Sequence, residues 1–499
     1  MFFNSLSFLI FFPLVVLIYF IIPRKVRYIW LLIASYYFYM SWNAKYAVLL
    51  LGSTVVTYLC GIMLSRCKKD DPKSGKNKKL IVALSLVINF AILFVFKYFG
   101  FGWSVLASVL GKAGISIGES PLSLLLPVGI SFYIFQAVGY TIDVYRGEID
   151  AEKNFFRYAL FVSFFPQLVA GPIERSKNLL GRLRDIDKID LWNINRIREG
   201  IVVMVYGYFL KMIIADRAGI YVDHIYAVDS YSLNKGFTVI LGILLFSLQI
   251  YCDFAGYTFI AIGAGKVMGI DLMTNFKMPY FAVSVKDFWN RWHISLSSWF
   301  KDYLYIPLGG SRKGKVRKYL NLMIVFLVSG LWHGAGWHFI VWGGMHGVLR
   351  VLEEMTQGIR DKACKILRID RKKSSNAFWC MLITFILVSI AWVFFRAESL
   401  RQALDILKQS VAWNPWVLTD GSLFEFGLTQ WDFNVLIAAL VVLVTVDILR
   451  YRGHSLAGWY SKQGLVFRWL FLGIAIMAII LAGVYGAGYN AAQFIYFQF

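Results

Sequence analysis

The sequence predicts an all-α, polytopic membrane protein, and three observations support that fold class. First, 59% of the 499 residues are hydrophobic and 16% are charged, whereas soluble domains carry about a quarter charged residues. Second, the apolar residues come in runs of about 20, the length that a helix needs to cross a hydrocarbon layer about 30 Å thick. Third, 17 tryptophans and 28 tyrosines suit aromatic belts at the two membrane surfaces. The lipid bilayer is therefore the first expected partner of this chain.

Ten apolar runs are long enough to be membrane-spanning helices. The first run has no basic residue before it and no small-residue cleavage site after it, so we interpret it as a retained span and not as a signal peptide. Four further segments are shorter or interrupted by polar residues, as re-entrant pieces are. The expected spans are 5–22, 28–42, 46–64, 80–98, 121–142, 199–215, 236–252, 378–396, 431–449 and 466–487, and the shorter segments are 155–171, 281–300, 319–331 and 335–349.

The formal net charge of +22 follows from basic residues that gather in short loops. Such loops face the cytoplasm under the positive-inside rule, which explains this charge better than nucleic-acid binding does, so no nucleic-acid partner is expected. One consistent threading then places both termini outside the cell. The basic loops are 23–27, 66–79, 312–318, 350–373 and 451–462, and the loops with few Lys and Arg are 99–120, 218–234 and 409–430.

No internal repeat of 20 to 50 residues is evident, and the longest connections are too short for a soluble domain. We therefore expect one integral membrane domain over residues 1–499. The stretch Ser374-Ser375-Asn376 is the expected start of a helix.

Three of the six histidines fall in one stretch, LVSGLWHGAGWHFIVWGGMHG. The apolar segment 320–331 before His333 would span about 18 Å as a helix, and two glycines, Gly334 and Gly336, then interrupt the pattern. A break at membrane depth is tolerated where protein buries it or where it lines a cavity. His333, beside Trp332, is therefore a candidate functional residue inside the membrane thickness. The alternative is a histidine that hydrogen-bonds between helices.

His338 and His346 have no such setting, and we expect them to be structural. His333 and His338 are five positions apart, so they do not form the i, i+4 pair of a helical zinc site, and no HExxH motif is present. The five cysteines are scattered without metal-ligand spacing. No metal site is expected.

A second polar block lies in VKDFWNRWHISLSSWFKDYLYIPLGGSRKGK. Asp287, Asn290, Arg291 and His293 stand there among tryptophans and phenylalanines. This mixture is typical of an amphipathic or re-entrant helix whose polar groups face a partly wet cavity. It equally suits an interfacial helix with an aromatic belt and snorkelling charges.

These blocks together resemble the membrane-bound O-acyltransferases, in the bacterial branch that acetylates alginate and D-alanylates teichoic acids. The matching stretches are LPVGISFYIFQAVGYTIDVYRG, FPQLVAGPIER, FWNRWHISLSSWFKDYLYIPLGG and LVSGLWHGAGWHFIVWGGMHG, and they keep the family's order over residues 120–350. A later phrase, IAWVFFRAESLRQAL, favours the alginate-acetylation type.

The resemblance implies a bundle of 10 to 12 transmembrane helices with re-entrant segments around a central channel, in a bacterial plasma membrane. Its core would be residues 120–350, followed by helices over 378–487 and an extracytoplasmic tail, 488–499. On the same analogy His333 matches the catalytic histidine and His293 the second polar position. Asp287, Asn290 and Arg291 surround His293, and we expect them, with Trp332, to line or support the channel.

The resemblance also implies the reaction and its partners. Members of this branch take an acyl group, here expected to be acetyl, from a cytoplasmic thioester of coenzyme A or of an acyl carrier protein, with no bound cofactor. An extracytoplasmic partner, expected to be an SGNH-type acyltransferase, completes transfer to a polysaccharide. A neutral imidazole is a suitable general base for this chemistry. The alternatives are D-alanyl transfer to teichoic acid and, from another class, a transporter or flippase.

The last seven residues, QFIYFQF, carry one further expectation. The D-alanylation machinery uses a small membrane peptide that ends in F-x-Y-x-x-F, and Phe494, Tyr496 and Phe499 have that spacing. The resemblance implies that Tyr496 accepts the acyl group as a phenolic ester and passes it to the outer partner. The alternative is an aromatic end of the last helix at the membrane interface.

Overall fold

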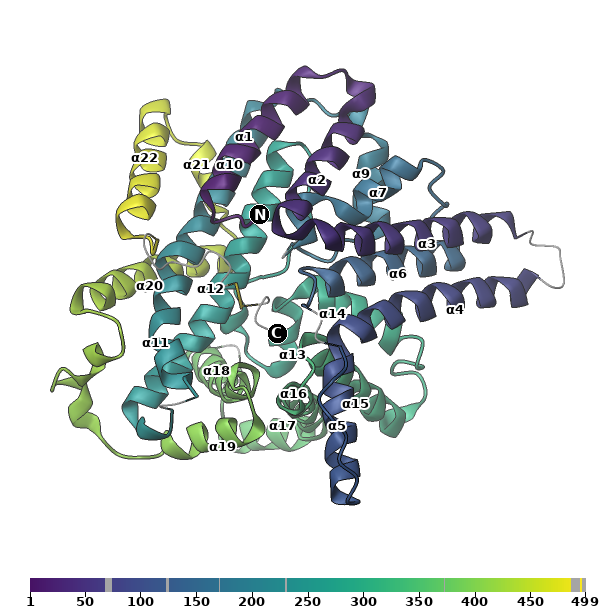
Figure 1. Ribbon diagram of the computed structural model, residues 1–499. Helices are drawn as coiled ribbons and strands as arrows, with labels where there is room; N and C mark the ends of the chain where they lie inside the picture. The colour runs from purple at the N-terminus through teal and green to yellow at the C-terminus, as the bar shows by residue number, and fades with distance from the viewer. Residues whose placement is uncertain are drawn as a thin grey trace. The chain divides into compact units, whose positions relative to one another are not determined.

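The computed structural model describes residues 1–67, 74–122, 125–169, 171–228, 231–371, 373–485 and 494–495. Within these residues every regular element is a helix and no strand occurs, so the expected all-α fold class is confirmed (Figure 1). The chain divides into two compact units. Unit 1 comprises Met1–Met204 with Ile260–Met273, and unit 2 comprises Val205–Phe259 with Thr274–Phe499.

Unit 1 holds the N-terminal helices together with the end of α12. Its helices are α1 (Leu6–Ile21), α2 (Arg27–Asn43), α3 (Ala47–Arg66), α4 (Ser74–Leu93), α5 (Phe99–Lys112), α6 (Ile130–Arg146), α7 (Phe155–Ser163), α8 (Phe165–Leu168), α9 (Ser176–Arg184) and most of α10 (Ile194–Tyr208), with short helical turns at η1 (Arg24–Val26), η2 (Ala44–Tyr46), η3 (Phe94–Tyr98) and η4 (Ile186–Lys188).

Unit 2 holds the later helices and most of α12. Its helices are α11 (Asp216–Tyr226), α12 (Phe237–Val267), α13 (Val285–Arg291), α14 (Ile294–Phe300), α15 (Gly314–His333), α16 (Trp337–Met355), α17 (Gln357–Ile366), α18 (Ser374–Arg396), α19 (Leu400–Gln409), α20 (Gln430–Tyr451), α21 (Leu456–Ser461) and α22 (Leu465–Ala482), with shorter elements at η5 (Phe209–Ala215), η6 (Tyr231–Leu233), η7 (Pro279–Phe281), η8 (Lys301–Tyr305), η9 (Pro415–Leu418) and η10 (Ser422–Glu425).

Six helical segments in the described part of the chain are long and apolar enough to cross a membrane, and α1 is a shorter apolar helix. The chain is therefore a multi-pass membrane protein, as expected, whereas the count of ten to twelve crossings stays a prediction. The six segments are Arg24–Arg66, Gly75–Lys112, Phe237–Val267, Ser374–Arg396, Gln430–Tyr451 and Leu465–Ala482.

Several boundaries differ from the expected ones. The span predicted over 121–142 becomes helical only at Ile130, because Gly129 before it has a left-handed φ of 75°. The span predicted to end at Cys252 continues to Val267, since the apolar pattern resumes after one polar residue. Part of the predicted loop 99–120 is helix α5, whose residues are apolar enough to continue the preceding segment. The expected helix start at Ser374-Ser375-Asn376 is confirmed, since α18 begins at Ser374.

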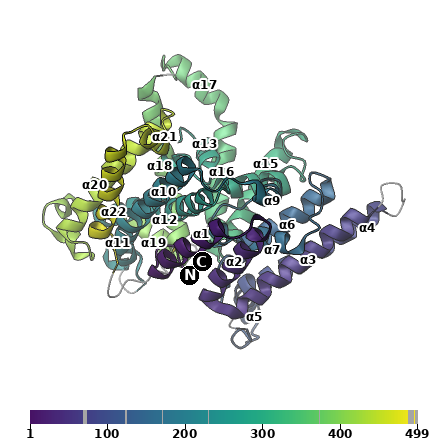
Figure 2. The same cartoon turned by 90° about the horizontal axis from the view of Figure 1, so that it is seen from above.

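Polar side chains join α3, α4 and α6 in unit 1, where these helices run side by side (Figures 1 and 2). The Ser53 hydroxyl on α3 donates to Asn89 Oδ1 on α4 at 2.6 Å, and Ser85 on α4 lies 3.2 Å from the Thr141 hydroxyl on α6. All four side chains are buried. Small hydrogen-bonding residues of this kind hold membrane helices together, because the surrounding lipid is as apolar as the helices themselves.

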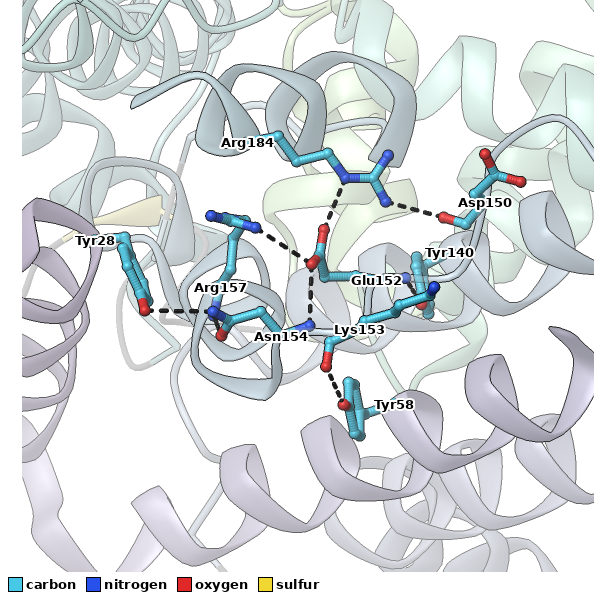
Figure 3. A network of polar contacts seen from close by, with 9 residues as sticks. All are labelled: Tyr28, Tyr58, Tyr140, Asp150, Glu152, Lys153, Asn154, Arg157 and Arg184. Atoms are coloured by element: carbon cyan, nitrogen blue, oxygen red, sulfur yellow. Dashed lines mark hydrogen bonds and ion pairs between the residues drawn. The ribbon is translucent and has the colours of Figure 1, made fainter. Parts of the chain in front are cut away.

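A buried carboxylate, Glu152, joins the loop after α6 to two neighbouring helices (Figure 3). Its oxygens accept hydrogen bonds from Arg184 Nε at 2.7 Å and from the Asn154 main-chain N–H at 3.0 Å, and Arg157 Nη1 lies 3.5 Å away. Its own N–H donates to the Tyr140 hydroxyl at 2.9 Å. The arginines come from α7 and α9 and Tyr140 from α6, so one residue connects three helices of unit 1.

A second buried carboxylate of unit 1, Glu174, belongs to the FPQLVAGPIER stretch and lies outside the six candidate spans. It accepts hydrogen bonds from the Asn178 side chain at 2.7 Å and from the Met273 main-chain N–H. Burial disfavours its charged form more than these bonds favour it, and raises the pKa of Glu174 to about 7.

Candidate active site

Helices α15 and α16 of unit 2 lie side by side through two glycines (Figure 2). A Cβ atom added to Gly330 on α15 would lie 2.2 Å from the Phe339 carbonyl oxygen, and one added to Gly343 on α16 would lie 2.2 Å from that of Phe326. Real Cβ atoms do not approach so closely, so only glycine allows the two main chains to touch. This contact fixes the end of α15 against the start of α16.

His333 is the last residue of α15, and its side chain is buried with 3% of its surface exposed. The expected break at Gly334 is present, and a Cβ there would lie 1.9 Å from the Phe339 ring, so glycine leaves the space that this ring occupies. Helix α15 is longer than the predicted segment 320–331, because it begins at Gly314 and its 20 residues extend for about 30 Å. The basic residues 315–318 continue the helix, since Lys and Arg are good helix formers.

His293 lies at the turn between α13 and α14, fully buried and in the left-handed region with φ 43°. A residue with a Cβ atom adopts this conformation at a cost of about 1–2 kcal/mol, so surrounding contacts must hold it. Asn275 provides these contacts. Its main-chain carbonyl oxygen accepts the Ile294 N–H at 3.0 Å. In its side chain, Oδ1 accepts the Ser295 hydroxyl at 2.6 Å and Nδ2 donates to the Thr258 hydroxyl on α12 at 3.3 Å.

The structure brings His293 and His333 together, with ring centroids 6.4 Å apart. Trp332 stands beside both rings, 6.0 Å from His293 and 4.9 Å from His333. Trp342 and Phe395 contact His333 edge-on at 5.0 and 5.3 Å. Two imidazoles in an aromatic surrounding can exchange protons with a hydroxyl that reaches them. His293 lies outside the six candidate spans, and burial lowers its pKa to about 3, which keeps its ring neutral.

The contacts of Asp287 and Arg291 are with other groups than these two rings. Asp287 and Arg291 face each other one turn apart on α13, with Arg291 Nε donating to Asp287 Oδ1 at 2.9 Å. Arg291 also stacks over the Tyr451 ring at 5.6 Å, and Asn290 is exposed. Asp287 also accepts the Val283 N–H at 3.2 Å, and its own N–H donates to the hydroxyl of Ser284, the residue that caps α13. These contacts hold α13 in place.

The two histidines expected to be structural lie near the same rings. His346 is fully buried, and its Nδ1 accepts a hydrogen bond from Trp289 Nε1 at 3.3 Å. It contacts Trp342 at 5.1 Å, so Trp342 separates it from His333. His338 is half-buried and packs on Phe339 at 4.3 Å.

The C-terminal segment is described only at Phe494 and Ile495; Tyr496 and Phe499 lie outside the described residues. Both described side chains are buried, at 0% and 2% exposure. The Phe494 ring lies 4.2 Å from that of Tyr257 and 6.3 Å from that of Phe254. Phe254 in turn meets His293 edge-on at 4.7 Å. One phenylalanine of α12 therefore contacts both the C-terminal segment and the histidine pair.

A buried cluster of charges in unit 2 was missed by the sequence reasoning. Lys211 lies in the π-helical segment η5, and its Nζ is 2.7 Å from a carboxylate oxygen of both Asp216 and Asp253. Lys211 and Asp253 are the charged residues at the end of the predicted span 199–215 and just after the predicted span 236–252. An ionisable residue within an apolar run marks a functional site by default, and this signal would have found them.

Among the residues that the structure describes, no group of three or more His, Cys, Asp or Glu side chains is placed to hold a metal ion. The candidate site therefore consists of imidazoles, aromatic rings and the hydrogen-bonded turn at Asn275.

Comparison with known proteins gives a consistent result. The family model for MBOAT, the membrane-bound O-acyltransferase family, matches residues 146–394, a range that includes both His293 and His333. The chain is 35% identical over 462 residues to the probable alginate O-acetylase of Azotobacter vinelandii, covering 92% of this chain and 87% of that protein.

Two further relatives act on cell-wall polymers according to their names. The peptidoglycan O-acetyltransferase of Helicobacter pylori is 36% identical over 414 residues, covering 77% of this chain and 74% of that protein. The teichoic acid D-alanyltransferase of Streptococcus thermophilus is 29% identical over 324 residues, covering 60% of this chain and 76% of that protein.

Proposed function

The chain belongs to the membrane-bound O-acyltransferase family, and from this premise we propose that it passes an acetyl group from a cytoplasmic thioester outward for O-acetylation of an extracellular polysaccharide. Its class is that of a multi-pass membrane acyltransferase. The acetyl group and the polysaccharide acceptor are supported by the names of the relatives that match most of this chain. The observation that carries the site is the approach of the His293 and His333 rings to 6.4 Å among aromatic side chains.

His333 acts in this proposal as the general base. Its neutral imidazole takes the proton of the attacking hydroxyl, whose oxygen adds to the thioester carbonyl and forms a tetrahedral oxyanion. When the oxyanion collapses, the carbon–sulfur bond breaks and the thiolate leaves with the proton from the imidazolium. The products are one ester and one free thiol. His293 positions the reacting groups and stabilises the developing charge, supported by the Asn275 turn.

We assign the attacking hydroxyl to Tyr496. A phenol is a reasonable covalent carrier only when a base takes its proton, because its pKa of about 10 leaves it unreactive alone. Support comes from the preceding residues, since Phe494 and Ile495 are buried and Phe494 contacts the same phenylalanine, Phe254, that contacts His293. The outer partner, of the SGNH type in this proposal, then takes the acetyl group from the tyrosine ester and delivers it to the polysaccharide.

The donor in this proposal is acetyl-coenzyme A or an acetylated carrier protein, both of which are acidic. Exposed basic residues at the start of α15, Lys313, Lys315 and Arg317, suit such a donor. The positive-inside rule would produce the same residues without a donor. A carrier protein and free coenzyme A are distinguished by supplying each alone to the purified protein.

The test is peptide mass spectrometry of the full-length protein, in lipid nanodiscs, after incubation with isotopically labelled acetyl donor. We expect a labelled acetyl group on the C-terminal peptide of the wild type. His333→Ala should lower its rate of formation by a factor of about 100 to 10,000, the usual contribution of a general base. His338→Ala, which changes a half-buried histidine five positions away, is the matched control and should keep the label.

Tyr496→Phe removes one oxygen, and we expect it to abolish both the label and polysaccharide acetylation. Tyr485→Phe makes the same chemical change at an exposed position eleven residues earlier and should have no effect. Normal acetylation by Tyr496→Phe would reject the covalent carrier. Normal acetylation by His333→Ala would reject the general base.

One other function has a specific observation in its favour. The F-x-Y-x-x-F spacing at 494–499 and the similarity to a D-alanyltransferase suit D-alanyl transfer to teichoic acid. Offering both donors to the same protein decides between them, because the mass of the adduct identifies the group transferred. A transporter or flippase would form no adduct at all, and the family assignment favours the acyltransferase.

A further inference from the structure

We propose that Asp253 is a positioning residue, which holds the C-terminal segment inside unit 2 by accepting the main-chain N–H of Ile495. This inference rests on the proposed role of Tyr496, the next residue along the chain. It assigns a function to the buried charge cluster that the reaction itself does not use.

The two oxygens of the Asp253 carboxylate have different partners. Oδ2 accepts the Ile495 N–H at 2.8 Å, and Oδ1 lies 2.7 Å from Lys211 Nζ. Lys211 also contacts Asp216 Oδ1 at 2.7 Å. All three charged side chains are buried, with at most 7% of any of them exposed. One cation therefore faces two anions, and the carboxylate of Asp253 keeps one oxygen for the C-terminal segment.

These groups lie together because the main chain of α12 packs closely against the segment from Gly207 to Lys211. Gly256 on α12 allows this packing, because a Cβ there would lie 2.8 Å from the Gly207 carbonyl oxygen and 3.0 Å from the main-chain nitrogen of Lys211. Lys211 lies in a π-helical segment, a feature that often occurs at functional sites. A buried carboxylate is stable only when it is paired and hydrogen-bonded, so a peptide N–H aimed at Oδ2 meets a strong acceptor.

Two neighbours of Asp253 on α12 also contact the C-terminal segment. Tyr257, one turn further on, lies against the Phe494 ring at 4.2 Å and carries Lys211 Nζ over its own ring at 5.6 Å. Phe254, the next residue after Asp253, contacts both Phe494 and His293. Consecutive residues of one helix thus touch the segment that precedes Tyr496 and the histidine pair. In this proposal a clamp at Ile495 holds the residue before Tyr496 close to the residues that contact the histidine pair.

Hydrogen–deuterium exchange of the C-terminal peptide tests the clamp without any acyl donor, because it follows the Ile495 amide itself. In the full-length protein in nanodiscs, Asp253→Ala should speed exchange of this amide about 10- to 100-fold, the effect of losing one hydrogen bond to a charged group. Asp216→Ala is the matched control. It removes the other carboxylate from the same lysine at the same distance, and should change the exchange less than about twofold.

The link to catalysis is tested from the donor side of the same hydrogen bond. Ile495→Pro removes the N–H and leaves every buried charge in place, so it stays informative if Asp253→Ala does not fold. It should slow labelling of Tyr496 about 10- to 100-fold, whereas Ile495→Ala, which keeps the N–H, should slow it little. Asp253→Asn keeps an acceptor oxygen and should restore part of the rate lost in Asp253→Ala. The double variant Asp253→Ala/Ile495→Pro should be no slower than either single one, because both remove one interaction.

The outcomes separate this inference from the function on which it rests. Equal effects of Asp253→Ala and Asp216→Ala on exchange would overturn the clamp and leave a merely structural cluster. Additive slowing in the double variant would overturn it as well. If exchange responds as expected but Tyr496→Phe acetylates normally, then the clamp holds the segment while its role in positioning Tyr496 is refuted together with the covalent carrier.

Discussion

Replacing Asn275 by alanine should release His293 from its left-handed turn and remove most acetyl transfer. The side chain is fully buried and makes one short and two long hydrogen bonds. The bond from the Ser295 hydroxyl, at 2.6 Å, lies in the preferred range, whereas those to the Ser295 N–H and the Thr258 hydroxyl, at 3.4 and 3.3 Å, exceed it. The cost comes chiefly from the first bond and from the buried Ser295 hydroxyl, which loses this acceptor in the variant.

These losses amount to about 2–3 kcal/mol, the upper part of the range for removing one partner of a buried hydrogen bond. The left-handed conformation of His293 itself costs about 1–2 kcal/mol, so the remaining contacts no longer favour it clearly. A change of 2–3 kcal/mol corresponds to roughly 30- to 150-fold in the equilibrium constant that favours the native turn. The rate of acetyl transfer should fall by about this factor, while the KM for the donor changes little, since Asn275 acts in this proposal through His293 and not through the donor.

The assay is acetyl transfer from labelled donor in nanodiscs, with thermal unfolding measured on the same samples. Asn321→Ala is the matched control, because Asn321 is equally buried and hydrogen-bonds the carbonyl oxygens of Leu308 and Gly310, about 18 Å along α15 from His333. We expect it to lower stability and to spare the rate per folded molecule. If Asn275→Ala transferred acetyl groups at the wild-type rate, or if both variants lost activity equally, the turn would not position His293.

Three further predictions concern packing and charge. Gly343→Ala should separate α15 from α16 and abolish activity, whereas Gly344→Ala, whose added Cβ meets its nearest neighbour at an ordinary 3.5 Å, should be nearly neutral; the transfer rate distinguishes them. Glu152→Ala should destabilise the protein by about 2 kcal/mol in thermal or denaturant unfolding, because it leaves two arginines without their shared carboxylate, and the exposed Glu148→Ala should cost less than about 0.5 kcal/mol. Glu174 has a raised pKa of about 7, so the folded state binds its proton more tightly than the unfolded state does. The free energy of unfolding should therefore fall as the pH rises from about 4.5 to 7 and then level off. Glu174→Gln should remove this pH dependence.

The sequence predicts the helix break at His333 well, because two glycines within three residues weaken a helix wherever they interrupt an apolar run. The all-helical class follows equally from the composition. The meeting of His293 with His333 does not follow from any spacing, since 40 residues separate them along the chain, and only the resemblance to a family pointed to both. The left-handed conformation of His293 was also beyond prediction, because it depends on Asn275, which lies in a loop without a local motif.

A buried pair of charges explains why the predicted end of one span was wrong. Asp253 ended the predicted span at Cys252, because a carboxylate within a lipid-facing helix would be costly. In the structure Asp253 faces the interior and meets Lys211, so the helix continues past it. Lys211 and Asp253 are 42 positions apart and lie on different elements. The pairing of these two residues cannot be predicted from one sequence. In the folded chain each charge is stabilised by the other, which makes the burial of both tolerable.

The hydrogen bond from Ile495 has a consequence for how this part of the chain can vary in evolution. Every amino acid except proline carries a main-chain N–H, so position 495 is free to drift in size and polarity as far as this contact is concerned. Position 494 is not free to change in this way, because the Phe494 ring packs against the ring of Tyr257. Related sequences should therefore keep an aromatic residue at 494 and an acidic residue at 253, exclude proline at 495, and otherwise let that position diverge.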